Sequence, residues 1–91
     1  MDYEWDDAKS EATRKDRGFG FEIVEGFEWN YALGPDIQYV DGEEREVWIG
    51  PIGTKLHVLV VTKRENRTRV ISLRIAEKPD IGRWRDEFQN A

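Results

Sequence analysis

The chain of 91 residues has no cysteine, three prolines and a single histidine, His57. A protein without cysteine can form neither disulfides nor thiolate zinc sites, and one histidine argues against a histidine-rich metal centre. No apolar run approaches the roughly 20 residues of a membrane span, and residues 1–18 lack the apolar core of a signal peptide. We therefore expect a cytoplasmic protein that uses neither a metal nor another cofactor.

Common catalytic motifs are also missing. The sequence contains no phosphate-binding loop, GxSxG or HExxH, and GFGF at residues 18–21 lacks the preceding strand of a dinucleotide-binding motif. The neighbouring carboxylates Asp6 and Asp7, like Glu43 and Glu44, are more typical of a helix cap and a turn than of an acid–base pair. The single histidine can act as a general acid or base, although a strand histidine beside tryptophan more often packs.

Charge is unevenly distributed along the chain. The net charge is −5, which is unusual for a protein that binds nucleic acid. Acidic residues outnumber basic ones in the first 25 positions, whereas residues 55–74 contain one acid, Glu65. The basic residues of this second segment are Lys55, Lys63, Arg64, Arg67, Arg69 and Arg74. The sequence therefore predicts a basic sheet on an acidic body.

The hydrophobic patterns predict one domain, residues 1–91, with helices at both ends of the chain. Asp6 is a predicted N-cap, and the helix that follows it is predicted to end before Gly18. Residues 21–29 have helical spacing and are predicted to form a second helix. A C-terminal helix is predicted over about residues 79–88.

Strand patterns occupy much of the remainder. Residues 2–5 and 37–40 are predicted to be short strands, whereas three longer runs are rich in β-branched residues. Short turns join the longer runs, so we predict three consecutive antiparallel strands at 45–50, 56–64 and 68–75. Strands and helices together predict a small α+β fold.

The turns of the two predicted hairpins decide which side chains share a face of the sheet. With turns centred on residues 52–53 and 65–66, one face is predicted to form the core under the helices. That face carries Val47, Ile49, Leu56, Val58, Val60, Ile71, Leu73 and Ile75. The opposite face places Trp48 beside His57 and Arg74, and its mixed character is typical of a surface that another molecule covers.

Arginine is the residue type that points most directly to a ligand. Arg64, Arg67 and Arg69 are predicted near the tip of the second hairpin on the core side, whereas Arg74 belongs to the open face. A guanidinium can donate two parallel hydrogen bonds to a phosphate. The alternative is that these arginines are solvent-facing charges that keep the sheet soluble. Trp48 offers a surface on which a base can stack.

Residues spread over nearly the whole chain form a further pattern. They are Trp5-Asp6, Lys9, Gly18, Phe21-Glu22, Glu44-Arg45, Ile49-Gly50, Thr62, Arg64, and Arg69-Val70-Ile71-Ser72-Leu73-Arg74 with Ala76. In these residues the sequence resembles the BrnT toxin family of bacterial type II toxin–antitoxin systems. It differs at Thr13, where the family has asparagine, at Arg17, where it has histidine, and at Ile75, where it has a second closing arginine.

The resemblance implies both a fold and an activity. The implied fold is RelE-like, with a small antiparallel sheet, two N-terminal helices and a C-terminal helix. The implied activity is that of a ribonuclease toxin, which cuts RNA without a metal and is neutralised by a BrnA-like antitoxin. The candidate catalytic residues are Lys9, Arg64, Arg69 and Arg74, and the candidate substrate-binding residues are Arg17, Trp48 and His57.

A second interpretation stays open. An arginine at the position of the family's histidine cannot shuttle protons at neutral pH. The chain is then a binding module with little or no catalysis, which keeps the toxin scaffold and its protein partner. The sequence does not decide between these two functions, nor does it give the oligomeric state.

Overall fold

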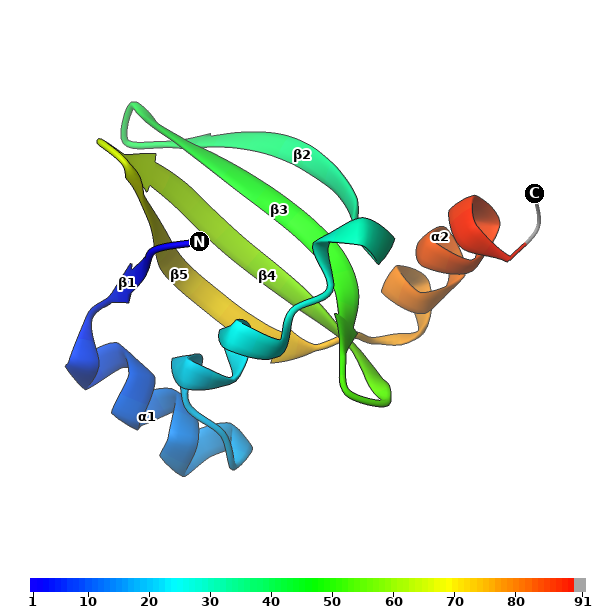
Figure 1. The fold of residues 1–91 in the computed structure, drawn as a ribbon, viewed down its shortest axis with the longest axis horizontal. Coiled ribbons are helices and arrows are strands. Elements are labelled where there is room, and N and C mark those ends of the chain that lie inside the picture. The colour runs from blue at the N-terminus through cyan, green and yellow to red at the C-terminus, as the bar shows by residue number, and fades with distance from the viewer. Residues whose placement is uncertain (90–91) are drawn as a thin grey trace.

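The structure is a computed structural model that describes residues 1–89. Its helices and strands form an α+β fold with α-helices near both ends of the chain (Figure 1). The elements are β1 (Tyr3–Trp5), α1 (Asp7–Arg17), the 3₁₀ helices η1 (Phe21–Gly26) and η2 (Trp29–Tyr31), β2 (Leu33–Val40), β3 (Glu43–Ile52), β4 (Lys55–Arg64), β5 (Arg67–Ile75) and α2 (Lys78–Phe88).

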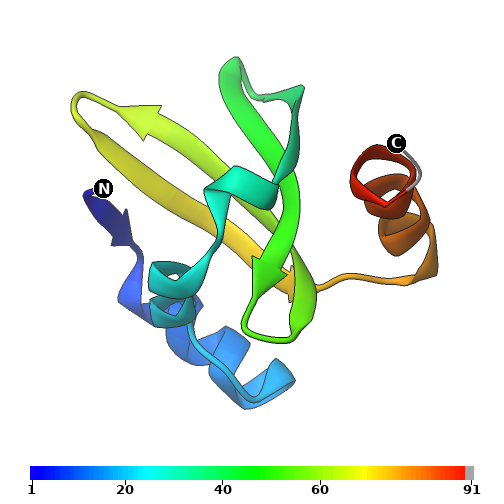
Figure 2. The ribbon, with the colours of Figure 1, turned by 45° about the vertical axis from the view of Figure 1, so that its right-hand side comes forward.

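The strands form one sheet in the order β1-β5-β4-β3-β2. The three long antiparallel strands are confirmed as β3, β4 and β5, and residues 37–40 belong to β2. However, β1 pairs with β5 in parallel, so the sheet is mixed and the expectation of a purely antiparallel sheet is wrong. Figures 1 and 2 show η1 and η2 crossing one face, while α2 stands at the end where β5 stops.

Helix α1 begins and ends where its sequence predicts. The Asp6 carboxylate accepts the backbone N–H groups of Ala8 and Lys9, which satisfies donors that the first turn leaves free. At the other end Gly18 has φ 87°, and its N–H donates to the carbonyl of Arg14. Glycine adopts this left-handed conformation without steric cost, so the helix stops there.

The second predicted helix is not an α-helix. Residues 21–29 instead contain η1, an extended Phe27 and the start of η2. The buried side chains Phe21, Val24 and Phe27 recur every three residues, which is the period of a 3₁₀ helix rather than that of an α-helix. This strict spacing lets all three side chains face the sheet.

Two apolar clusters hold the fold together, one on each face of the sheet. The larger lies between η1 and the sheet and consists of Phe21, Val24, Phe27, Leu59, Val61, Val70 and Leu73, with Trp29 of η2 packed against it. The smaller lies under α2 and consists of Ile49, Val58 and Ala76, with Trp84 and Ile81 packed against it. The sheet therefore buries apolar side chains on both faces, although α2 covers only one end of the second face.

A β-bulge in β5 changes the predicted register. Near the turn Val61 pairs with Val70 as predicted, but Ile71 has no partner, and beyond it Leu59 pairs with Leu73. One extra residue turns every later side chain to the other face. Arg74 consequently lies opposite Val58, on the face away from Trp48 and His57.

Several predicted positions are therefore wrong. Trp48 and His57 do not lie on an open face beside Arg74, because their face is the one that η1 and η2 cover. Leu59 and Val61, predicted on the open face, are core residues with 0 % exposure. The first hairpin turns at residues 53–54 rather than 52–53. Each residue of β3 therefore pairs two positions further along β4 than predicted, which leaves the faces of this hairpin unchanged.

The packing of η1 against α1 depends on one buried hydroxyl. Ser10 is buried in α1, and its Oγ accepts the backbone N–H of Phe21 at 2.8 Å. We expect Ser10→Ala to lower the free energy of unfolding by about 1–3 kcal/mol, because the buried N–H of Phe21 then lacks an acceptor. Urea denaturation measures this loss. Lys15→Ala, at an exposed position of α1, is the control and should change stability by at most about 0.5 kcal/mol. Equal stabilities of the two variants contradict the prediction.

Candidate functional site

Five arginines share the face of the sheet opposite η1 and η2. Side chains alternate along a strand, and the observed register brings these positions to one side of β3, β4 and β5. We call this group the arginine face: Arg45, Arg64, Arg67, Arg69 and Arg74. Arg64 and Arg69 therefore lie on the face away from η1 and η2, and not on the side that these helices cover, as predicted. The bulge that separates Arg74 from Trp48 unites it with the other arginines.

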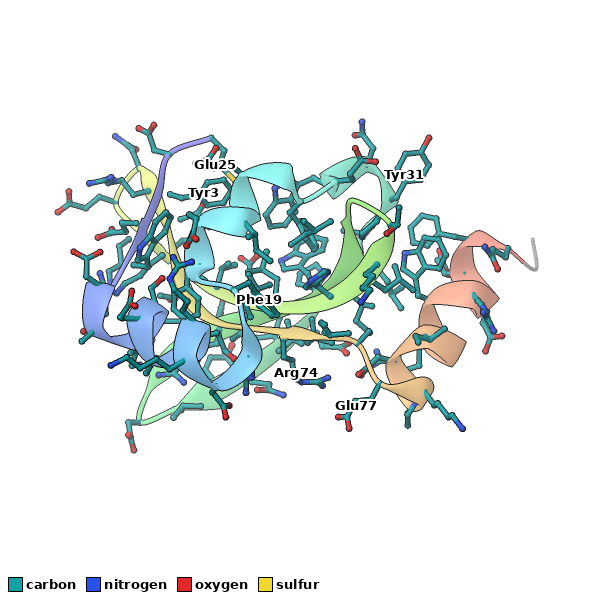
Figure 3. All side chains as sticks on the ribbon, turned by 90° about the horizontal axis from the view of Figure 1, so that it is seen from below. Tyr3, Phe19, Glu25, Tyr31, Arg74 and Glu77 are labelled. Carbon is teal, nitrogen blue, oxygen red and sulfur yellow. The ribbon has the colours of Figure 1, made fainter. Side chains whose placement is uncertain are left out.

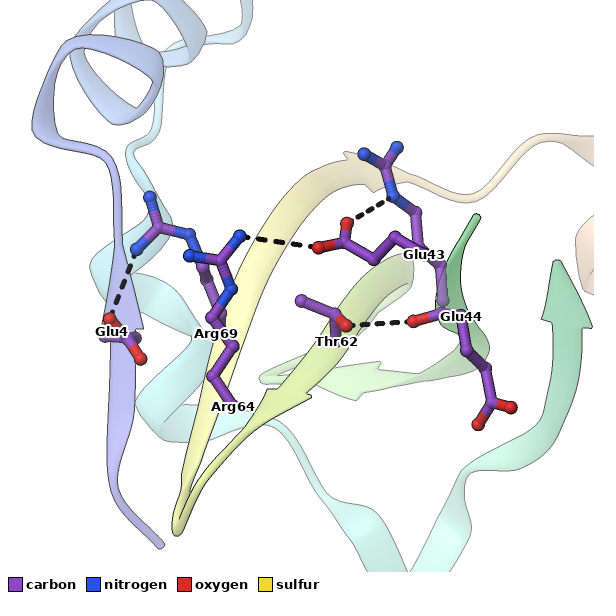
Figure 4. A network of polar contacts seen from close by, with 7 residues as sticks. Glu4, Glu43, Glu44, Thr62, Arg64 and Arg69 are labelled. Carbon is purple, nitrogen blue, oxygen red and sulfur yellow. Dashed lines mark hydrogen bonds and ion pairs between the residues drawn. The ribbon is translucent and has the colours of Figure 1, made fainter. Parts of the chain in front are cut away.

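Carboxylates accompany the arginines at the tip of the second hairpin (Figure 4). Glu43 pairs with Arg45 at 3.2 Å and with Arg64 at 3.4 Å, and the Arg45 guanidinium, aided by Arg64, lowers the pKa of this carboxyl. Glu4 of β1 pairs with Arg69 at 3.2 Å. The face is thus less basic than its arginines alone suggest. The Arg45 and Arg69 pairs are partly buried, whereas the Arg64 pair is exposed and stabilises little, so a phosphate competes most readily for Arg64.

Arg74 lies at the opposite end of β5 and contacts the start of α2. Its Nη1 is 2.8 Å from Asp80 Oδ2 and 3.5 Å from Glu77 Oε1. The same Asp80 oxygen accepts the backbone N–H of Glu77, which fixes the carboxylate in the first turn of α2. The hydrogen bond from Arg74 lowers the pKa of Asp80, so this carboxylate is ionised at neutral pH.

The edge of β5 is open where Arg74 lies. Within residues 1–89, β1 is the strand on this side of β5, and its pairing ends at Val70. Beyond that point Arg17, the last residue of α1, donates from Nη1 to the free carbonyl of Leu73 at 2.9 Å. The hydrogen bond anchors the end of α1 to the strand edge.

A pocket of about 320 Å³ lies at this edge and is lined by Arg17, Phe19, Arg74 and Ile75. We call it the edge pocket. Figure 3 shows Phe19 beside the end of α1, and Arg74 on the strand that runs from there toward α2. The pocket combines two cations, which suit a phosphate, with an aromatic and an aliphatic side chain, which suit an apolar or planar group.

The predicted site residues do not all converge. Arg17 and Arg74 meet at the edge pocket. Arg64 lies opposite Arg67 in the β4–β5 ladder, at the far end of β5 from Arg74. At the usual rise of a strand, Arg67 and Arg74 are about 23 Å apart along β5. Lys9 is exposed and lies two turns before Arg17, about 12 Å along α1. Arg64 is therefore too far from Arg74 for the two side chains to contact the same phosphate.

Trp48 and His57 lie away from the open surface. Trp48 is half-buried against Trp29, with ring centroids 5.1 Å apart, and its Nε1 donates to Glu46. His57 is 5 % exposed, and burial lowers its pKa, so the ring is neutral at pH 7. A neutral imidazole whose Nδ1 lies 3.0 Å from the carbonyl oxygen of Lys55 must donate its proton there.

Sequence reasoning missed two residues of this region. Phe19 lies between the two predicted N-terminal helices and was not predicted to belong to a site, yet it lines the edge pocket and its ring meets His57 edge-to-face at 5.7 Å. Asp80 was treated as part of the C-terminal helix alone, although it neutralises Arg74. The place of an aromatic residue directly after a predicted helix end was the available signal for Phe19, whereas nothing local in the sequence connects Asp80 with Arg74.

A larger groove, of about 510 Å³, separates α2 from the β3–β4 hairpin and includes Leu56, Ile81 and Trp84. Among residues 1–89 there is no group of three histidine, aspartate or glutamate side chains placed to hold a metal ion. None of the helices in the same range is long and apolar enough to cross a membrane.

Comparison with known families decides the broader identity. The profile described as "Ribonuclease toxin, BrnT, of type II toxin-antitoxin system" matches residues 5–80, which is most of the chain. The chain belongs to the BrnT family. The BrnT match includes strands β2 to β5 and the edge pocket, but only Trp5 of β1, and it ends at Asp80, so most of α2 lies outside it. No curated protein and no solved structure matches the chain.

The BrnT family consists of ribonuclease toxins that act in type II toxin–antitoxin systems. Such a system implies an RNA substrate and a protein antitoxin as partners. The edge pocket and the five residues of the arginine face all lie within the range that matches the BrnT family.

The contact between Arg74 and Asp80 predicts a pH-dependent stability. The folded-state pKa of Asp80 is lowered, so its carboxylate stabilises the fold above the unfolded pKa of about 3.9, and this stabilisation is lost as the pH falls through the folded pKa. We expect Asp80→Asn to be less stable than the wild type at about pH 7, with the difference shrinking by about pH 2. Urea denaturation at both pH values tests this. Glu87→Gln, at an exposed position of α2, is the control, and a difference that does not change with pH contradicts the prediction.

Proposed function

We propose that this chain cuts RNA at the edge pocket and that the arginine face binds the RNA on either side of the cut. The sheet with its flanking helices serves as a RelE-like scaffold for this site. The observation that supports the proposal most directly is the meeting of Arg17 and Arg74 at the open edge of β5. Both positions fall within the residues that match the BrnT family.

Arginine suits the chemistry of RNA cleavage. In the proposed step the 2′-hydroxyl of a ribose attacks the adjacent phosphorus, and the bond from phosphorus to the 5′-oxygen of the next nucleotide breaks. The hydroxyl proton passes to solvent, and the leaving oxygen takes a proton from solvent. Negative charge increases on the phosphoryl oxygens, where preorganised cationic donors are most effective. Arg74 and Arg17 are the proposed donors, and the step requires no metal.

The remaining arginines have a supporting role in this proposal. Arg69 and Arg64 continue along the same face toward the hairpin tip, at distances that fit flanking phosphates rather than the phosphate that is cut. Lys9 extends the cationic positions along α1. Trp48 and His57 are not included among the residues that contact RNA, because they lie beneath other side chains.

The partner that neutralises the toxin is proposed to be a BrnA-like antitoxin. The family supports an antitoxin of some kind, and the resemblance in sequence supports this type. A partner that covers the edge pocket or the arginine face prevents RNA from reaching the arginines.

A second function is favoured by a specific observation. The edge pocket has arginine where the family has histidine, and the chain's own histidine is buried behind Phe19. Arginine cannot exchange protons at neutral pH, so the pocket's four lining residues lack a proton-transfer group. A protein that binds its partner, and RNA, without efficient cleavage is therefore the alternative.

Expression of the chain tests the ribonuclease function. We expect the wild type to stop growth and Arg74→Ala to relieve the arrest, with RNA cleavage falling about 10²- to 10³-fold, the usual effect of removing one charge-stabilising donor. Arg83→Ala is the control, since it removes an exposed arginine that pairs with Asp36 outside the pocket. Co-expression of the neighbouring open reading frame should restore growth.

Cleavage by the purified wild type should persist when EDTA is present. Loss of cleavage in EDTA contradicts the metal-independent step. If Arg74→Ala arrests growth as strongly as the wild type does, and circular dichroism shows both proteins folded, Arg74 is excluded from the site.

Restoring the family's histidine separates the two functions. We expect Arg17→His to increase RNA cleavage and to add a pH dependence near the histidine pKa of about 6.5, because an imidazole can transfer protons. Arg17→Gln is the matched control, since it also removes the guanidinium that donates to Leu73 but supplies no group that can transfer a proton. If the wild type, Arg17→His and Arg74→Ala all leave RNA intact while the protein still binds a BrnA-like partner, the binding-module function replaces the enzyme.

A further inference from the structure

We propose that Phe19 is the surface on which one base of the bound RNA stacks, so that the edge pocket holds a single nucleotide. The proposal rests on RNA being the ligand of the edge pocket, as proposed above. It assigns to Phe19 a role that the sequence suggested for Trp48, whose ring is instead packed under η2.

The lining of the edge pocket divides into two halves. Arg17 and Arg74 supply guanidinium groups, while Phe19 and Ile75 supply an aromatic ring and an aliphatic side chain. A nucleotide has the same division, with a charged phosphate and a planar base that stacks on aromatic side chains. If its phosphate contacts the arginines, the base lies next to Phe19.

The size of the edge pocket limits its occupant. A volume of about 320 Å³ is at the lower end of the range of about 300–1,000 Å³ found for small-molecule pockets. The pocket therefore suits one nucleotide and not a longer stretch of structured RNA. A base that stacks inside it must be unpaired, so the substrate class is single-stranded RNA.

The ring of Phe19 is supported from behind by the fold. Phe19 follows Gly18, whose left-handed conformation turns the chain away from α1 and toward the edge of the sheet. His57 meets the Phe19 ring edge-to-face, at an interplanar angle of 77°, and is itself held by the carbonyl of Lys55. His57 is thus a positioning residue that fixes a preformed stacking surface, and its own contact with RNA is not needed.

The proposal is tested with short single-stranded oligonucleotides whose 2′-hydroxyls are methylated, so that they bind without being cut. One series is intact, and in a second series each position in turn lacks its base. Dissociation constants are measured by fluorescence anisotropy for the wild type, Phe19→Leu and Phe19→Tyr. The leucine variant keeps an apolar side chain, and the tyrosine variant keeps the ring.

We expect Phe19→Leu to bind the intact oligonucleotide about 5-fold or more weakly, which is the lower end of what one stacked base contributes. Phe19→Tyr should bind as the wild type does. At one position of the oligonucleotide, removal of the base should weaken binding by the wild type to the same extent. The Phe19→Leu variant should bind that base-free oligonucleotide no more weakly than the wild type does.

The outcomes distinguish this inference from the proposed function. If the wild type binds or cuts RNA and Phe19→Leu binds both series as the wild type does, stacking on Phe19 is refuted while the ribonuclease function stands. An equal loss on intact and base-free oligonucleotides in Phe19→Leu also refutes stacking. If the wild type neither binds nor cuts RNA, the proposed function fails and this inference fails with it. Circular dichroism of each variant verifies that the fold is retained.

Discussion

Ile71 is the residue of β5 that has no partner on β4, and the arrangement of the functional side chains depends on it. On the turn side of this bulge, Arg69 lies on the arginine face while Val70 enters the larger core cluster. On the other side, Arg74 stays on the arginine face while Leu73 enters the same cluster. Without the extra residue, a regular alternation places Arg69 and Arg74 on opposite faces of the sheet.

Arg74 is held in place by a carboxylate with which the phosphate of the proposed RNA substrate must compete. Asp80 gives the guanidinium a fixed position and a counter-charge. A charge-assisted hydrogen bond of this kind orients the side chain, but it must be exchanged or shared when a phosphate binds. The first turn of α2 therefore contributes to the site, although the rest of that helix lies beyond the residues that match the family.

Local signals in the sequence predicted much of the fold. The Asp6 cap, the Gly18 stop and the three long strands all follow from interactions between residues close in sequence. The bulge was not predictable in this way, because β5 reads as a regular apolar alternation and only its packing against β4 and η1 selects the extra residue. Arg74 was consequently assigned to the face that carries Trp48 and His57. Of the residues at the edge pocket, the family pattern named Arg17 and Arg74 as candidates. The roles of Phe19 and Asp80 depend on tertiary contacts, so the sequence alone did not indicate them.

The hydrogen bond from Arg17 to Leu73 also occupies a backbone group at an edge of the sheet where another chain could pair. A strand whose backbone groups are unpaired is a template on which another chain can extend the sheet, and such edges lead to aggregation unless they are blocked. Strand β1 blocks one half of the β5 edge, and a charged side chain from α1 occupies the carbonyl at Leu73 in the other half. The guanidinium that lines the edge pocket, where RNA is proposed to bind, therefore also occupies a carbonyl to which a second strand would otherwise pair.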